Sequence, residues 1–117
     1  MKYFDFERLE VYQTSLDYLI LIEQLIRSLP KGNFHLCDQL YRASTSITLN
    51  IAEGAGEYAP KEKARFYRMA KRSATESASV LEILQKLKLT EEKTYNKGRE
   101  YLIRVVSMLT RMIKSRE

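Results

Sequence analysis

The sequence has few of the residues that break or crosslink a chain. Its 117 residues include one cysteine, two prolines, four glycines and no tryptophan. A single cysteine excludes an intramolecular disulfide framework and fits a reduced, cytoplasmic setting. So little glycine and proline argues against collagen-like, linker-rich and many-turned all-β chains. The most apolar run, residues 16–26, contains Asp17, Glu23 and Gln24, so we expect no membrane span there.

What is present suits one helical domain with unevenly placed charge. The length fits a single domain, residues 1–117, that can bury a core of its own. The net charge is +5, but residues 1–60 hold five Lys/Arg against eight Asp/Glu, and residues 61–117 hold fifteen against seven. This asymmetry favours binding to a polyanion or to an acidic partner surface. The alternative is that the basic face only keeps the protein in solution.

Three breaks divide the chain into four expected helices. They are the Pro-Lys-Gly turn at 30–32, the glycine-rich segment 54–60 that ends in proline, and Thr90, an expected N-cap followed by acids. Gly54 and Gly56 are expected to cap the second helix at its C-terminus. The short linkers predict an all-α fold, an antiparallel up-down-up-down four-helix bundle. The helices are expected at about 7–28, 35–54, 60–88 and 91–115.

Two apolar stripes run along the first expected helix. One consists of Leu9, Tyr12, Leu16, Leu19 and Ile26. So wide an apolar face exceeds what one bundle core needs, so we expect a subunit interface of a homo-oligomer, with generous core burial as the alternative. We place that interface on the second stripe, at Val11, Tyr18, Ile22 and Leu25.

The sequence shows no catalytic constellation. The single histidine and single cysteine, His35 and Cys37, lie two residues apart and do not share a helical face. A di-iron Glu-x-x-His motif is ruled out because Gly32 stands three residues before His35. The glycines of the second break follow a helix rather than linking a strand to a helix, so they do not form a phosphate loop. We therefore expect no enzyme activity, no metal site and no cofactor.

A polar stripe lies beside the expected core face of the second helix. Arg42, Ser46, Asn50 and Glu53 share it, and Glu76 of the third helix is a candidate partner. The stripe is open to three interpretations: a solvated face, a half-buried network between helices, or a ligand site. We expect Ser46, Asn50, Glu53 and Glu76 to be partly buried and hydrogen-bonded between helices.

Basic side chains form two further stripes, one on the third helix and one on the last. Side by side on antiparallel neighbours, they would bind phosphate backbones without reading sequence. Tyr58 and Tyr67 lie close enough to the first stripe for base stacking. The candidate nucleic-acid-binding residues are Lys61, Arg65, Arg68, Lys71, Arg72, Arg104 and Arg111.

Three segments carry a family resemblance. Residues 42–54, RASTSITLNIAEG, match the pattern R-A-x-x-S-I-x-x-N-I-A-E-G at every fixed position. Residues 6–13 are similar to F-x-x-L-x-V-W-Q, with Tyr12 in place of tryptophan, and Phe66, Ser73 and Glu76 fit positions of a third helix. The chain thus resembles the four-helix-bundle proteins named for the intervening sequences of bacterial 23S ribosomal RNA genes. It is also similar to accessory variability proteins of diversity-generating retroelements.

The resemblance implies a bundle that assembles into a ring of five, and relatives that work with a reverse transcriptase and RNA. It brings no catalytic residues. We therefore expect a non-enzymatic homo-oligomer, by resemblance a pentamer, that binds RNA or DNA through a basic helix face. The alternative is a protein-binding scaffold whose basic face docks an acidic protein. The family positions, structural or functional, are Arg42, Ser46, Asn50, Glu53, Ser73 and Glu76.

Overall fold

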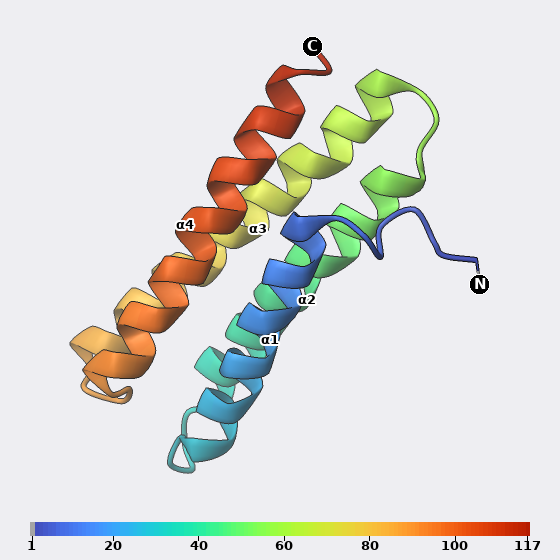
Figure 1. The fold of residues 1–117 in the computed structure, drawn as a ribbon. Helices are drawn as coiled ribbons and strands as arrows, with labels where there is room; N and C mark the ends of the chain where they lie inside the picture. Colours follow the sequence, from blue (N-terminus) through green and yellow to red (C-terminus); the bar gives the residue numbers. More distant parts are fainter. Residues whose placement is uncertain (1) are drawn as a thin grey trace.

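The computed structural model describes residues 2–117 and consists of four helices joined by short turns. Consecutive helices run antiparallel (Figure 1). Each packs against its two neighbours in the order α1–α2–α3–α4–α1, and within residues 2–117 no Cα atoms of the diagonal pairs come within 8 Å of each other. This is the up-down-up-down four-helix bundle that the sequence predicts. The helices are α1 (Glu10–Ser28), α2 (Phe34–Gly56), α3 (Pro60–Lys86) and α4 (Glu92–Lys114).

The helix ends follow local chemistry, with one exception. Gly32 has a φ of +99°, a conformation that glycine adopts readily, and it turns the chain between α1 and α2. Pro60 begins α3, where its missing N–H is not needed. Thr90 is not the N-cap of α4. Glu91 occupies that position without a side-chain cap bond, so the expectation for Thr90 is wrong by one residue.

The end of α3 has a left-handed residue that is not glycine. Lys88 has a φ of +60°. Its amide donates to the carbonyl of Gln85 at 3.0 Å, and the next amide, of Leu89, donates to the carbonyl of Leu84 at 2.9 Å. These two bonds satisfy carbonyl groups at the helix end, as in a Schellman motif.

The core takes one stripe from each helix, and on α1 it takes the stripe that the sequence analysis assigned to a subunit interface. Val11 and Leu25 are 2% and 6% exposed, and Tyr18 and Ile22 are fully buried within the single chain. The interface assignment for these four residues is therefore wrong, because they point to the bundle axis. The other stripe of α1 lies at the margin of the core and is half-buried: Leu9, Tyr12, Leu16, Leu19 and Ile26.

A buried hydroxyl network joins three helices inside this core. Tyr18 of α1 shares a hydrogen bond with Ser77 of α3, whose hydroxyl lies 3.1 Å from that of Ser44 on α2. Burial raises the pKa of Tyr18 to about 12 because the phenolate would be desolvated. Nearby, the hydroxyl of Thr48 donates to that of Ser15 at 3.1 Å. Within residues 2–117 no buried side-chain nitrogen or oxygen lacks a hydrogen-bond partner, which fits the rule for native interiors.

Between residues 2 and 117, none of the helices combines the length and the apolar character needed to cross a membrane.

Candidate functional site

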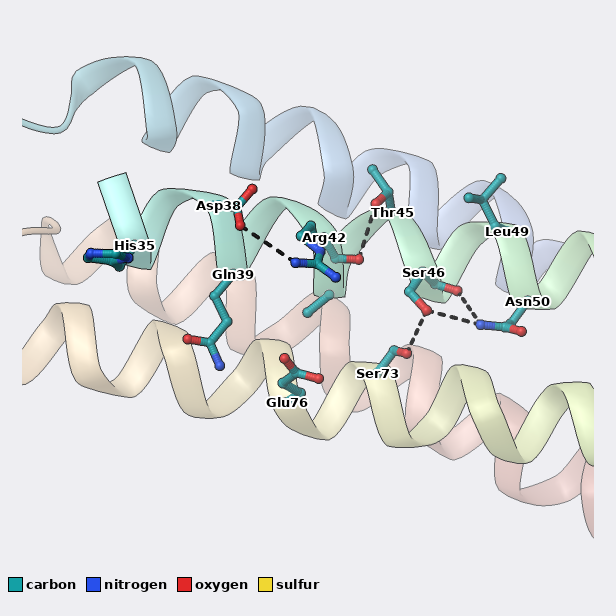
Figure 2. A pocket seen from close by; sticks show the side chains of 11 residues that line it. His35, Asp38, Gln39, Arg42, Thr45, Ser46, Leu49, Asn50, Ser73 and Glu76 are labelled. Carbon is teal, nitrogen blue, oxygen red and sulfur yellow. Dashed lines mark hydrogen bonds and ion pairs between the residues drawn. The ribbon is translucent and has the colours of Figure 1, made fainter. Parts of the chain in front are cut away.

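Most of the polar family positions lie around one groove on the outside of the bundle, between α2 and α3 (Figure 2). We call it the α2–α3 groove. Its volume is about 780 Å³. Five of the six family positions contribute to its wall, and only Glu53 does not. The lining residues are His35, Asp38, Gln39, Arg42, Ala43, Thr45, Ser46, Leu49, Asn50, Ser73 and Glu76.

Two serines connect the helices at the floor of the groove. The hydroxyl of Ser46 on α2 lies 2.8 Å from that of Ser73 on α3, and both residues are half-buried. Asn50 donates through Nδ2 to the backbone carbonyl of Ser46 at 2.9 Å and to its hydroxyl at 3.0 Å. The expected link between helices therefore exists, but it is made by the serines, while Asn50 bonds within its own helix.

The charged family positions are more exposed than expected. Glu53 and Glu76 are both exposed and form no hydrogen bond or ion pair within residues 2–117, so the expectation that they are partly buried and hydrogen-bonded between helices is wrong for both. Arg42 has a side chain that is 79% exposed and sits 3.7 Å from Asp38 on the same helix. These positions turn away from the core stripe of their helices, so the bundle leaves their charges in water.

Gly54 has a packing role rather than the expected capping role. It lies inside α2, which continues to Gly56, and it is buried. A Cβ placed on it would stand 2.7 Å from Cε1 of Tyr67 and 3.1 Å from Cβ of Phe66, both on α3. The motif glycine thus lets the two helices approach closely. The end of α2 is instead satisfied by Lys63, which donates to the carbonyls of Gly54 and Ala55 at 3.3 and 2.8 Å.

A second candidate site covers the outer face of α3. We call Lys61, Arg65, Arg68, Lys71 and Arg72 the α3 basic surface. Four of these residues, all except Lys61, line one hollow of about 580 Å³. Its other walls come from the same helix, from the last turn of α4 and from the C-terminal residue: Met69, Thr75, Ile113 and Glu117.

The charges of this surface are mostly free to meet a ligand. Arg65 donates to Glu62 at 2.7 Å, and that hydrogen bond raises the pKa of the guanidinium. No acidic side chain within residues 2–117 forms a salt bridge with Arg68, Lys71 or Arg72. An aromatic ring is available at the start of α3, where Tyr58 is 98% exposed.

Three other candidates lie elsewhere. Tyr67 is 1% exposed, so it is not available for base stacking. On α4, Arg104 lies 3.9 Å from Glu10 of α1, and Arg111 lines a hollow with Leu9 and Glu10. The α4 stripe therefore faces the α1 side, and the expectation that it adjoins the α3 stripe is wrong. A sequence pattern shows the spacing of residues within each stripe but not the rotation of the helix about its axis, and that rotation decides which neighbouring helix the stripe faces.

Two exposed apolar side chains lie close together where α1 meets α2. Ile20 is 59% exposed and Tyr41 is 47% exposed. Together with Leu19 they line a hollow of about 430 Å³. We call Leu19, Ile20 and Tyr41 the α1–α2 apolar strip. Across residues 2–117, no three His, Cys, Asp or Glu side chains converge in a way that could hold a metal ion.

Comparison with known proteins agrees with the resemblance. The sequence model of the 23S rRNA-intervening sequence protein family matches residues 7–111. The chain belongs to this family. The match spans both the α2–α3 groove and the α3 basic surface.

Solved structures of similar fold exist, whereas no curated protein matches the chain. One is a protein of unknown function from the S23 ribosomal protein family of Bacteroides thetaiotaomicron. It is 24% identical, covers 89% of this chain and 98% of its own length, and superposes with a TM-score of 0.83. At this identity the likeness shows a common fold alone.

Proposed function

We propose that this member of the family is a non-enzymatic, oligomeric bundle of the cytoplasm that binds RNA or DNA through the α3 basic surface. The observation that carries the proposal is the convergence of Arg65, Arg68, Lys71 and Arg72 around one hollow, with only Arg65 in a salt bridge within residues 2–117. Cations on a helix face neutralise phosphates and release counterions, and this contact does not depend on the base sequence.

The binding experiment compares two triple charge reversals. Changing Arg65, Arg68 and Arg72 to Glu should abolish retention of single-stranded RNA and DNA. Reversing Arg104, Arg111 and Lys114 alters the net charge equally on α4 and should weaken binding far less. For the unaltered protein, the logarithm of affinity should fall with the logarithm of salt concentration, with a slope of about −0.7 per phosphate contact.

Two outcomes would contradict the nucleic-acid proposal. One is a wild-type protein that retains neither RNA nor DNA at about 50 mM salt, where electrostatic binding is strong. The other is equal loss of binding in both triple reversals, because net charge alone would then explain the affinity. Circular dichroism of each variant shows whether the bundle is intact.

The α1–α2 apolar strip supports the oligomeric part of the proposal. Ile20 and Tyr41 are exposed in the single chain and Leu19 is half-buried, and a subunit contact would remove their apolar surface from water. The residue pair Ile20 and Ile22 offers a matched test, since the first is 59% exposed and the second is fully buried. Ile20→Lys should dissociate the oligomer and keep the fold, whereas Ile22→Lys should unfold the chain.

Light scattering decides the outcome. A wild-type mass of 13.8 kDa, that of one chain, at tens of micromolar would refute assembly. Five chains is the number that the family resemblance implies.

One observation also favours a second function, a scaffold that docks an acidic protein. Met69 and Ile113 line the same hollow as the arginines, and apolar side chains beside cations suit a protein surface. Affinity capture with and without nuclease separates the two functions. Selective retention of an acidic protein that survives nuclease treatment, without direct RNA binding, would favour the scaffold.

A further inference from the structure

We propose that the α2–α3 groove is a base-recognition site for single-stranded nucleic acid whose backbone lies on the α3 basic surface. This inference rests on the proposed nucleic-acid binding and deepens it. In this arrangement the α3 basic surface positions the strand, and the α2–α3 groove selects among the bases. Single strands are the relevant ligand class because their base edges are free to enter a protein groove.

The two surfaces adjoin along α3. Arg72 lines the basic hollow, and the next residue, Ser73, lines the groove. Glu76, four residues after Arg72 and therefore its neighbour on the helix surface, also lines the groove. A strand held by its phosphates at Arg68 and Arg72 thus has the groove directly beside it.

The lining groups have the chemistry of base-edge readers. Figure 2 shows Gln39 of α2 and Glu76 of α3 pointing into the space between the helices. Amides of Asn and Gln both donate and accept, a guanidinium donates, and a carboxylate accepts from the amino groups of bases. Arg42 and Asn50 supply the remaining groups. Exposed His35 at the start of α2 adds an imidazole of the kind on which bases stack.

The groove also disfavours phosphate. Two carboxylates, Asp38 and Glu76, stand against the single guanidinium of Arg42, so the formal charge of the lining is −1 with His35 neutral. The phosphates of a bound strand would therefore stay on the α3 basic surface, and the uncharged bases would face the groove.

Contacts within the bundle leave several polar atoms of these side chains without a hydrogen-bond partner. Within residues 2–117, Gln39 and Glu76 form no side-chain hydrogen bond, and Asn50 uses only its Nδ2 group, which leaves Oδ1 to accept. Arg42 has its one ion pair at 3.7 Å in solvent, where such a pair contributes little to stability. Amides and charges without a partner at a groove wall are available to a ligand.

The test measures binding of fluorescein-labelled single-stranded RNA homopolymers of A, C and U by fluorescence anisotropy. Wild-type protein should prefer one homopolymer over another by at least about fivefold, the low end for a good base contact. Glu76→Gln and Asn50→Ala should each reduce that preference to below about twofold, with an unchanged salt slope because phosphate contacts are retained. Glu53→Gln and Asn96→Ala alter the same residue types outside the groove and should keep the preference.

Each outcome decides between the proposals. Equal affinity for all homopolymers, or a preference that survives both groove variants, would overturn base recognition and leave phosphate binding in place. A base preference that survives both groove variants would also be expected if the groove binds a protein segment instead of bases. A wild-type protein that binds no homopolymer would refute the proposed function and this inference with it. Thermal unfolding of the groove variants confirms that they are folded, since neither residue is buried.

Discussion

The substitution Gly54→Ala tests the packing of α2 against α3 most directly. An alanine Cβ would meet the Tyr67 ring at 2.7 and 2.9 Å, closer than real Cβ atoms approach. The ring belongs to a residue that is 1% exposed, so it has little room to move. Overpacking of a core costs about 1–3 kcal/mol, and a ring with so little room to move places the cost at about 2–3 kcal/mol. The better helix propensity of alanine returns about 1 kcal/mol. We therefore expect a net loss of about 1–2 kcal/mol.

Gly56 gives a control in the same helix. An alanine Cβ there would have no heavy atom within 4 Å, so Gly56→Ala should stabilise the chain by about 0.5 kcal/mol. In thermal unfolding followed by circular dichroism, Gly54→Ala should lower the midpoint by about 4–10 °C, and Gly56→Ala should raise it slightly.

Gly54→Asn separates packing from capping. A left-handed capping position accepts asparagine better than alanine, whereas a close helix contact rejects the larger side chain more strongly. The packing argument therefore expects the order Gly, Ala, Asn in decreasing stability. A Gly54→Ala protein as stable as wild type, or an asparagine variant more stable than the alanine variant, would refute it.

Three further predictions concern single side chains. Burial raises the pKa of Tyr18 from 10.0 to about 12, so the protonated phenol contributes fully to the free energy of unfolding below pH 10, and this contribution is lost as the pH rises towards 12. Between pH 10 and pH 12, urea unfolding of the wild type should lose about 2–3 kcal/mol more than that of Tyr18→Phe. Lys88→Gly should raise stability by about 0.5 kcal/mol, since glycine adopts the positive φ of that position without strain; an unchanged urea midpoint would contradict this. Glu53→Ala should change the unfolding free energy by less than about 0.5 kcal/mol because the side chain is exposed; a larger loss would show a contact beyond the single chain.

The fold followed from the sequence because its signals are local. Proline, glycine and short polar turns mark helix ends through backbone geometry, and periodicity shows that each helix has an apolar face. Short linkers between long helices then leave few arrangements other than an antiparallel bundle. All observed helix bounds lie within three residues of the expected ones. The left-handed conformation of Lys88 after α3 is one that a sequence pattern does not reveal.

The direction of each stripe was not predictable in the same way. On α1 two apolar stripes were equally periodic, and only the rotation of the helix in the bundle selects Tyr18 and Ile22 for the core. Tyr18 suits the interior because its hydroxyl shares a hydrogen bond with that of Ser77, a pairing across 59 positions of sequence. Gly54 was expected to be a cap for the same reason, since a contact between residues far apart in sequence decides its role. Its partner ring, that of Tyr67, comes from another helix.

Of the three surfaces used in the proposals, the α1–α2 apolar strip and the α3 basic surface lie on different parts of the bundle, and this placement makes them compatible. The α1–α2 apolar strip centres on Ile20 of α1, and the α3 basic surface occupies the helix diagonally across the bundle from α1, with no Cα atom within 8 Å of α1 in residues 2–117. A subunit contact through the strip would leave Arg68 and Arg72 in solvent. Each copy in an oligomer would then present its own basic surface, and several weak phosphate contacts on one strand would reinforce one another. The charge division supports the same arrangement, because the basic excess lies in residues 61–117, whereas the apolar strip lies in the acidic half of the sequence.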